Sequence, residues 1–335
     1  MADVAIVIPN YNGIAYLDAC LRSVSGQTDV RMEIIVVDNG STDGSRQFIE
    51  EHYPACILVC LDRNYGFCRA VNEGISRARS PYVILLNNDT EVLPGFAAGL
   101  VEAIRKDERR FSCAARMLQY RERERLDSAG DFYCALGWGV ARGKGKPKER
   151  YASGGRIFSA CAGAAIYRTE EVRRLGGFDE AHFAYLEDMD LGWRARIHGW
   201  YNWYAPEAQV LHVGSATSGS RYNRFKVLHS AGNNLYMIYK NMPPAQILLN
   251  LPLLLAGFAV KYLFFAGKGF GKDYREGLLR GLRLCRDYPD RRVRFVWKRL
   301  PAYAGIQLEL WKNILLFLPG RGGIRGKRMR TLDQG

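Results

Sequence analysis

Short apolar runs alternate with amphipathic segments along the first part of the chain. Four of the runs have the length and the β-branched content of buried parallel strands: Val4–Ile8, Glu33–Asp38, Ile57–Leu61 and Tyr82–Leu86. Between them, apolar residues recur at helical spacing, as in Leu17, Leu21 and Val24 and again in Val71, Ile75 and Ala78. This alternation predicts a doubly wound α/β sheet, whose ligands lie beyond the carboxyl ends of the strands.

The pattern of strands and helices continues to about residue 213. Pro94 is expected to open a helix that carries Phe96, Leu100 and Ile104. The stretch from Tyr120 to Gly155 is rich in Arg, Lys, Glu and Gly, which predicts an exposed insertion. After it we expect a strand, a helix and a last strand at Arg156–Tyr167, Glu187–His198 and Asn202–Val213.

The positive charge of the chain is concentrated after residue 220. Residues 221–335 contain 22 Lys and Arg against 6 Asp and Glu, whereas residues 1–220 contain 26 against 28. Such a basic region suits nucleic acid or an anionic membrane. The segment Gln246–Ala266 contains one formal charge, Lys261. So apolar a stretch is not expected in an arm that binds nucleic acid. The pattern therefore favours a membrane partner and no nucleic acid.

The apolar segments Gln246–Ala266 and Ile306–Leu318 leave two interpretations of this region open. The first segment is long enough to cross a bilayer, but Asn250 and Pro252 argue against a span. We therefore expect helices that lie in the membrane interface, and a chain ending near Tyr239 that stays in solution and keeps its ligand site. The alternative is a helical subdomain packed on the rest of the chain or on a second subunit, which would make the protein a homodimer.

The cysteines and the first residues indicate the compartment. Eight cysteines are scattered without a C-x-x-C pair or a zinc-binding spacing of Cys and His. This predicts reduced thiols in a cytosolic protein. The run Val4–Ile8 follows Asp3 and lacks the basic flank and the length of a signal peptide, which favours a strand.

Polar clusters follow each of the first four predicted strands, at Pro9–Gly13, Asp38–Ser45, Arg63–Phe67 and Asn87–Glu91. Any one of them alone is ordinary turn chemistry, because Asn, Asp, Gly and Ser are turn residues. Four clusters on one edge of one sheet would instead line a single crevice with carboxylates and amides. The arrangement predicts a site for a nucleotide and its metal ion.

The residues of these clusters carry a family resemblance. The stretches IVIPNYNG, VVDNGSTDGS, NYGFCRAVNEG, LLNNDTEVLPGF and GGFDEAHFAYLEDMDLGWRARIHGW resemble the inverting family 2 glycosyltransferases of the GT-A fold. The elements NNDT and FxYxEDxDLxxR are most similar to those of bacterial rhamnosyltransferases. The resemblance covers roughly residues 4–220 and is more specific for fold and reaction than for the sugar.

The resemblance implies a function and a domain organisation. A single sugar, with rhamnose as a candidate, would pass from a dTDP- or UDP-sugar to a glycan or lipid-linked saccharide acceptor. Residues 1–220 would form the GT-A-like mixed-sheet catalytic domain, with a nucleotide-binding half at 1–95 and an acceptor half at 96–220. Residues 221–335 would form a helical, basic region. This region would hold the enzyme on the cytoplasmic face of the inner membrane as a peripheral or monotopic protein.

The resemblance also implies which residues bind the donor nucleotide. Asp38 would accept a hydrogen bond from the N3–H group of a pyrimidine. The other positions that match nucleotide-binding motifs are Pro9, Asn10, Tyr11, Arg63, Asn64, Gly66, Asn72, Asn87 and Asn88.

The triplet Asn87-Asn88-Asp89 aligns with the family's D-x-D motif and departs from it at the first position. Asp89 would bind Mg²⁺ or Mn²⁺ together with the diphosphate, which the metal neutralises as the glycosidic bond breaks. Asn87 can only donate or accept hydrogen bonds. His212 matches a metal-ligating histidine of the family, although a lone His is more often structural.

Asp188 matches the family's general base, which takes the proton of the acceptor hydroxyl. Capping is the alternative, because acids in a first helical turn favour the helix dipole. Glu187 would bind the acceptor or cap the helix. Asp127 and Gly163 match positions near the acceptor.

Three other functions are weighed against this one. A processive polysaccharide synthase should carry a Q-x-x-R-W segment, which the chain lacks. A nucleotidyltransferase should have a loop rich in glycine and lysine where PNYNG follows the first strand. A catalytically weak nucleotide- or carbohydrate-binding scaffold should have lost Asp89 or Asp188, and both are present.

Overall fold

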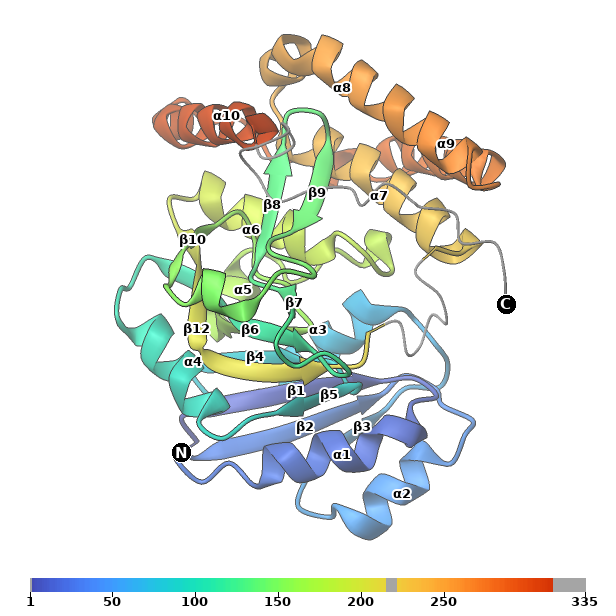
Figure 1. Cartoon of the computed structure of the whole chain (residues 1–335). Coiled ribbons are helices and arrows are strands. Elements are labelled where there is room, and N and C mark those ends of the chain that lie inside the picture. Colours follow the sequence, from blue (N-terminus) through green and yellow to red (C-terminus); the bar gives the residue numbers. More distant parts are fainter. Residues whose placement is uncertain (1, 215–221, 316–335) are drawn as a thin grey trace, which may run out of the picture.

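The computed structural model describes residues 2–214 and 222–315. The strands of its main sheet are β1 (Val4–Asn10), β2 (Met32–Asp38), β3 (Ile57–Cys60), β4 (Tyr82–Leu86), β5 (Thr90–Val92), β6 (Arg110–Gln119), β7 (Leu126–Ser128), β10 (Gly155–Ile157), β11 (Ala164–Arg168) and β12 (Tyr201–His212). The strand order is β10-β12-β6-β11-β4-β1-β2-β3, while β5 pairs with β12 and β7 with β6 (Figure 1). Strand β11 runs antiparallel to β4 and β6, which makes the sheet mixed.

The helices that accompany this sheet are α1 (Ile14–Ser25), α2 (Ser45–His52), α3 (Phe67–Arg77), α4 (Phe96–Arg105), α5 (Thr169–Arg174) and α6 (Glu187–Ile197), with short 3-10 turns at Lys148–Tyr151 and Glu180–His182. The C-terminal helices are α7 (Arg224–Asn241), α8 (Pro244–Ala266), α9 (Gly271–Asp287) and α10 (Leu300–Ile314), with 3-10 turns at Pro289–Arg291 and Trp297–Arg299.

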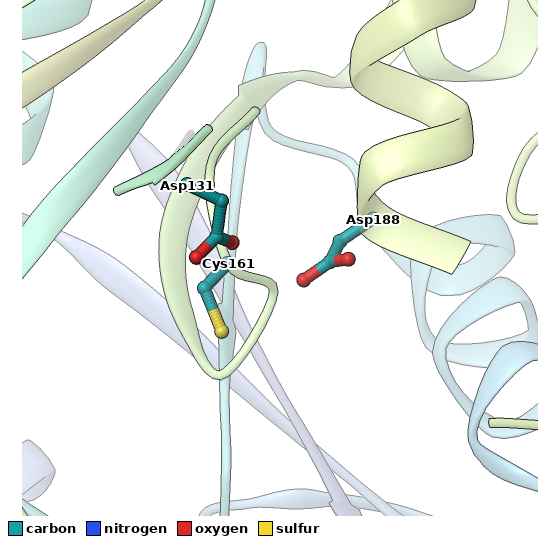
Figure 2. A group of neighbouring side chains, drawn as sticks. All are labelled: Asp131, Cys161 and Asp188. Carbon is teal, nitrogen blue, oxygen red and sulfur yellow. The ribbon is translucent and has the colours of Figure 1, made fainter. Parts of the chain in front are cut away.

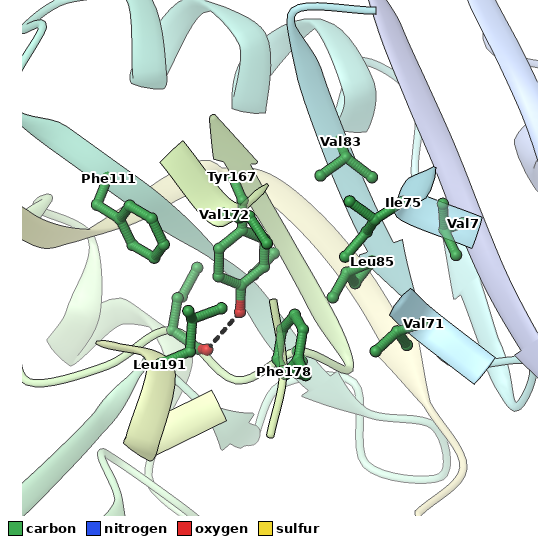
Figure 3. Packing of buried hydrophobic residues seen from close by; sticks show 14 of the residues in the cluster. Val7, Val71, Ile75, Val83, Leu85, Phe111, Tyr167, Val172, Phe178 and Leu191 are labelled. Carbon is green, nitrogen blue, oxygen red and sulfur yellow. Dashed lines mark hydrogen bonds between the residues drawn. The ribbon is translucent and has the colours of Figure 1, made fainter. Parts of the chain in front are cut away.

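The side chains of β1 alternate between two hydrophobic cores. Val4, Ile6 and Ile8 pack with residues of α1 and α4 on one face of the sheet. Ala5 and Val7 pack with residues of α3 and α6 on the other face, where the Tyr167 hydroxyl donates a 2.9 Å hydrogen bond to the carbonyl of Ala160 (Figure 3). Because both faces are covered at β1 and β4, these strands are apolar along most of their length, as the sequence indicates. The predicted doubly wound sheet is confirmed.

Strands β1, β2, β3 and β4 are parallel, so their carboxyl ends lie at one edge. The register pairs Asn10 with Asp38 and Asp38 with Cys60. The polar clusters that follow these strands therefore meet at this edge, as expected from the sequence.

Two elements differ from their predicted form. The expected strand at Arg156–Tyr167 is divided between β10, at the end of the sheet path beside β12, and β11, between β4 and β6. The loop of residues 158–163 between them turns Cys161 and Gly163 toward the edge where the site lies. Helix α4 begins at Phe96, because Gly95 adopts a left-handed conformation with φ 77° and separates it from Pro94.

The expected exposed insertion between Tyr120 and Gly155 is partly buried. It contains a hairpin of β8 (Asp131–Cys134) and β9 (Trp138–Ala141) that extends toward α8 and α10 (Figure 1). Tyr133 is fully buried in a core that also holds Trp193 of α6 and Leu310 of α10. The charged composition of this stretch therefore gave no indication that its hairpin packs against the C-terminal helices.

The C-terminal helices share a hydrophobic core with the preceding part of the chain. Ile306 and Leu310 of α10 belong to the second apolar segment, which was expected to lie in the membrane interface, but both are buried in the core that surrounds Tyr133. The expected second apolar segment ends at Leu318, and its residues 316–318 lie outside the described residues. Helix α8 has 23 residues, and a window of 18 residues within it has a mean hydropathy of 1.9, so length and composition alone would allow it to cross a membrane.

Candidate active site

A cavity of about 710 Å³ opens at the carboxyl ends of β1 and β4. It is enclosed by the sheet edge, the loop before α6, the end of β12 and the first turn of α7. Its lining residues are Pro9, Asn10, Tyr11, Asn39, Asn64, Gly66, Phe67, Asn87, Asn88, Asp89, Cys161, Gly163, Phe183, Ala184, Tyr185, Leu186, Glu187, Asp188, His212, Asn223, Phe225 and Lys226.

The edge of the sheet is fixed by a chain of buried amides. Asn88 Nδ2 donates to Asn10 Oδ1 at 2.7 Å, and Asn10 Nδ2 donates to Asp38 Oδ2 at 3.1 Å. The other oxygen of Asp38 accepts from the backbone N–H of Ser41 at 3.0 Å. A Cβ at Gly13 would lie 2.0 Å from Asn88 Nδ2, so only glycine fits beneath these amides. Asp38 thus orients Asn10 and does not itself line the cavity.

Asn39 and Asn64 join the second and third clusters. Asn39 Nδ2 donates to Asn64 Oδ1 at 3.0 Å and to the carbonyl of Gly66 at 3.1 Å. Gly66 has φ 88°, and a Cβ there would lie 2.6 Å from the Phe183 carbonyl oxygen. This glycine lets the start of α3 approach the loop before α6, which closes the cavity.

Asp89 and His212 form a corner that suits a divalent cation. His212 Nε2 lies 3.3 Å from Asp89 Oδ1, and Asp127 Oδ2 lies 2.8 Å from His212 Nδ1. Burial lowers the pKa of His212, but its hydrogen bonds to Asp127 and Asp89 outweigh burial and raise this pKa to about 9. A carboxylate behind a histidine that faces a second carboxylate is a common arrangement around protein-bound metals, so these residues fit Mg²⁺ or Mn²⁺.

Asp188 lies in the first turn of α6 and lines the cavity. Its Oδ1 accepts from the backbone N–H of Met189 at 2.7 Å, and its Oδ2 accepts from the backbone N–H of Ala162 at 3.2 Å. Burial raises the pKa of Asp188 despite these two hydrogen bonds. The residue before the helix, Leu186, adopts a left-handed conformation and provides no side-chain cap. A carboxylate held in this way can accept a proton from a hydroxyl in the cavity.

Comparison with known proteins identifies the family. Residues 5–176 match the model of glycosyl transferase family 2. The chain belongs to this family. It is also 30% identical over 247 residues to N-acetylglucosaminyl-diphospho-decaprenol L-rhamnosyltransferase from Mycobacterium tuberculosis, an alignment that covers 65% of this chain and 79% of the relative.

Solved glycosyltransferases share the fold of this family 2 glycosyltransferase. GalNAc-T7 with UDP, GalNAc and Mn²⁺ matches with a TM-score of 0.57 and 16% identity over 72% of this chain and 48% of that one. Residues 1–349 of S. aureus TarS with UDP-GlcNAc match with a TM-score of 0.52 and 17% identity over 90% and 83%. Both likenesses show the GT-A fold.

Besides Asp38, two other residues that were expected to bind the nucleotide, Asn72 and Arg63, lie outside the lining of the glycosyltransferase cavity. Asn72 Nδ2 donates to the Phe178 carbonyl at 2.8 Å, and Asn72 Oδ1 accepts from the Phe178 N–H at 2.9 Å. Its amide therefore joins α3 to the loop before α6, because the polar side of a helix can face protein as well as ligand. Arg63 is exposed, with its guanidinium 4.7 Å from the centre of the Tyr65 ring.

Asp127, expected beside the acceptor, also lies outside the cavity lining. It accepts from His212 and from Lys144 Nζ at 2.6 Å. Burial raises the pKa of Asp127, but these two neighbours outweigh it and lower the pKa to about 2. Asp127 therefore orients His212. Glu187 and Gly163, the other residues expected near the acceptor, do line the cavity.

A second carboxyl group faces Asp188 and was missed in the sequence. Asp131 of β8 is 9% exposed, and its carboxyl points toward Asp188 and Cys161, all three groups lying within 4.8 Å of one another (Figure 2). Burial and the charge of Asp188 raise the pKa of Asp131 well above its usual range. Its only sequence signal was a carboxylate inside the apparently exposed insertion.

One side of the glycosyltransferase cavity is aromatic. Phe183, Tyr185 and Phe225 line it, with the Phe225 ring 6.1 Å from Phe183 and 6.0 Å from Tyr185. Phe225 and its neighbour Lys226 belong to α7, so the C-terminal region contributes to the site. The sequence assigned all site residues to positions before Val213 and missed this contribution.

Proposed function

We propose that this family 2 glycosyltransferase transfers one sugar, with inversion, from a pyrimidine nucleotide-diphosphate sugar to a saccharide acceptor at a membrane. The observation that carries the proposal is Asp188, a carboxylate of raised pKa in a cavity that also holds the Asp89–His212 corner. Rhamnose is the first donor sugar to test, because the Mycobacterium tuberculosis relative is an L-rhamnosyltransferase.

The chemical step is a direct displacement. The acceptor oxygen forms a bond to the anomeric carbon while the bond from that carbon to the diphosphate breaks. The proton of the acceptor hydroxyl passes to Asp188, which lines the cavity that would hold the acceptor. Displacement on one face of the sugar by a nucleophile on the other face inverts the anomeric configuration.

Asp89 and His212 would hold the divalent cation, and Asp127 would keep Nε2 of His212 directed at it. When bound, the cation supplies positive charge for the departing diphosphate. Asn10, Asn64 and Asn88 would donate to and accept from the nucleotide along the sheet edge. The aromatic rings of Phe183, Tyr185 and Phe225 offer apolar faces on which an acceptor sugar can stack.

The surface of α8 supports the proposed membrane location. Leu248, Leu255 and Leu263 are 68%, 62% and 67% exposed, whereas Gln246 and Asn250 of the same helix are buried. The amides of Asn250 and Gln307 exchange hydrogen bonds of 2.8 and 2.9 Å between α8 and α10. A helix that buries its polar amides against the protein and exposes its leucines is suited to contact with the apolar interior of a membrane.

We infer that α8 lies along the membrane and does not cross it. One face of the helix is covered by protein at Gln246, Asn250, Leu254 and Gly257. A Cβ at Gly257 would lie 1.9 Å from the Leu136 carbonyl oxygen, so the hairpin approaches this face closely. The basic residues of 221–335 would add attraction to an anionic cytoplasmic leaflet.

A donor panel tests the proposal. The purified chain is incubated with Mg²⁺ or Mn²⁺ and with dTDP-rhamnose, UDP-glucose, UDP-N-acetylglucosamine or GDP-mannose, and the released nucleoside diphosphate is measured. We expect slow hydrolysis of one pyrimidine nucleotide-sugar, in which water replaces the acceptor, and its loss in Asp188→Asn. Preferred hydrolysis of GDP-mannose would contradict the pyrimidine assignment, and equal turnover by Asp188→Asn would contradict the mechanism.

A further inference from the structure

The loop that precedes Asp188 has a strained backbone. Phe183, Tyr185 and Leu186 have φ values of 64°, 74° and 67°, in the left-handed region that non-glycine residues avoid. All three residues line the cavity, and Leu186 is the residue from which α6 begins. Such conformations persist where the surrounding structure imposes them, and they concentrate at functional sites.

The side chain of Asn233 in α7 binds this loop. It is fully buried, and its Nδ2 donates to the carbonyls of His182, Ala184 and Tyr185 at 2.9, 2.8 and 2.8 Å. An amide nitrogen carries two hydrogens, so the three carbonyls share them. One side chain from the C-terminal region therefore satisfies three backbone groups of the strained segment.

Arg280 of α9 fixes the orientation of that amide. Its Nη1 donates to Asn233 Oδ1 at 2.6 Å, and its Nη2 donates to the Ala181 carbonyl at 3.1 Å. Because a guanidinium only donates, it keeps the oxygen of Asn233 on its own side and the nitrogen toward the loop.

Glycines let Arg280 reach Asn233. A Cβ at Gly232 would lie 2.7 Å from the Gly277 carbonyl oxygen, and a Cβ at Gly281 would lie 2.7 Å from that of Gly232. Helices α7 and α9 thus pack backbone against backbone beside Asn233. Figure 1 shows α7 and α9 side by side next to the catalytic domain.

We propose that Asn233 and Arg280 are positioning residues for sugar transfer, which hold the loop Phe183–Leu186 in its strained form and thereby set the place of Asp188. The inference rests on the proposed role of Asp188 as the base. It makes two C-terminal helices part of the catalytic machinery, although the residues that carry the chemistry precede them in the chain.

Asn234 provides a matched control. It is the next residue of the same helix, it is buried, and its amide makes two hydrogen bonds, whereas the amide of Asn233 makes four. Its partners are the Tyr133 hydroxyl and the Gly137 carbonyl, which belong to the β8–β9 hairpin and not to the loop. Asn233→Ala and Asn234→Ala therefore each remove a buried amide of α7 and its hydrogen bonds, and only the first removes the support of the loop.

The experiment compares wild type, Asn233→Ala, Asn234→Ala and Asp188→Asn in donor hydrolysis, in nucleoside diphosphate binding by calorimetry and in hydrogen exchange of residues 181–188. We expect kcat of Asn233→Ala to fall by about tenfold to a hundredfold while nucleotide affinity stays within about threefold. The backbone of residues 181–188 should exchange faster in this variant. Asn234→Ala should lower the melting temperature of the protein but leave kcat and the rate of hydrogen exchange in residues 181–188 unchanged.

Arg280→Ala and Arg280→Lys keep the test decisive if Asn233→Ala does not fold. Arg280→Ala should lower kcat with little change in nucleotide affinity, and Arg280→Lys, which restores one donor, should recover part of it. The positioning role would be overturned by an unchanged kcat in Asn233→Ala or Arg280→Ala. It would also be overturned if Asn233→Ala and Asn234→Ala lost kcat equally. In either case an inactive Asp188→Asn would still support the assignment of Asp188 as the base. An active Asp188→Asn would overturn both.

Discussion

Lys240 of α7 lies with its ammonium nitrogen 2.9 Å from Oδ2 of Asp190 in α6, and both side chains are buried. The same ammonium is 2.7 Å from Asp179 Oδ2, in the loop before α6. The cluster Asp179–His182–Asp190 resembles a metal-binding group in its geometry. Because Lys240 bridges its carboxylates, we interpret it as an ion-pair network that joins the C-terminal region to the helix of Asp188.

This network predicts that Lys240→Met is strongly destabilising. The substitution removes the ammonium group that Asp179 and Asp190 share, although both carboxylates stay buried. The expected loss is about 3 kcal/mol of unfolding free energy. Denaturant unfolding measures it, with Lys272→Met, a change of an exposed lysine in α9, as the control. A loss for Lys240→Met as small as that of the control would show that the network contributes little.

A chain that ends near Tyr239 is expected to misfold for the same reason, contrary to the expectation from sequence. Truncation there removes Lys240 and also Ile306 and Leu310, which complete the core around Tyr133. We expect aggregation or a molten chain without nucleotide affinity, observed by circular dichroism and calorimetry. A cooperative unfolding transition in the truncated chain would contradict this account.

The two carboxyl groups that face each other in Figure 2 should differ in their effect. Asp188→Asn should lower kcat by about 10² or more with donor affinity changed only a few-fold, because a general base is lost. Asp131→Asn should keep most of the activity at neutral pH, because burial and Asp188 raise the pKa of Asp131 and favour its neutral form.

The pH dependence of kcat in the same variants provides the check. Asp188 acts when ionised, so kcat should fall as the pH falls through its pKa, which burial raises above the usual value of 3.8. The Asp131→Asn profile should keep this acid limb. Equal losses in both variants at neutral pH would mean that both carboxyl groups are needed in ionised form.

Metal dependence follows from the Asp89–His212 corner. Asp89→Asn should nearly abolish turnover, and Asp127→Asn should weaken metal affinity by about tenfold to a hundredfold, because Asp127 orients His212. Titration of Mg²⁺ and Mn²⁺ against hydrolysis rate measures both effects. Full activity of the wild type in excess chelator would contradict the assignment.

The exposed leucines of α8 predict binding to anionic vesicles. Salt should weaken the binding without abolishing it, because burial of apolar side chains does not depend on ionic strength. Glutamate at Leu248 and Leu255 together should abolish co-sedimentation, whereas Ile57→Glu, at an exposed position of β3, should leave it unchanged. If the wild type ignores the vesicles and instead dimerises through α8 as judged by light scattering, the face contacts a second copy of the chain.

The sequence was informative where local pattern decides the structure. The burial of β1 on both faces follows from its continuous apolar run, and the polar clusters that follow β1, β2 and β4 led to Asn10, Asn88 and Asp89. Asn72 was expected beside the nucleotide but lies outside the cavity lining, because a polar residue in the first turns of α3 can face either a ligand or the loop at Phe178. The pattern does not distinguish the two.

Contacts between distant segments were not predictable in this way. Asp131 comes within reach of Asp188 because the hairpin folds back on α6, and Asn233 meets the loop before α6 through packing of α7. Neither contact has a local signature, since each depends on how helices and hairpin pack in three dimensions. The charge of residues 221–335 suggested a separate region, whereas its buried residues complete the catalytic domain.

The central claim is that the cavity performs a direct displacement at an anomeric carbon. The most direct measurement is a proton NMR time course of the accepted nucleotide-sugar with the protein and Mg²⁺, recorded before the released sugar mutarotates. The account predicts that the first sugar signals belong to the anomer opposite to that of the donor, and that they disappear in Asp188→Asn. Initial signals with the donor's own configuration would contradict it.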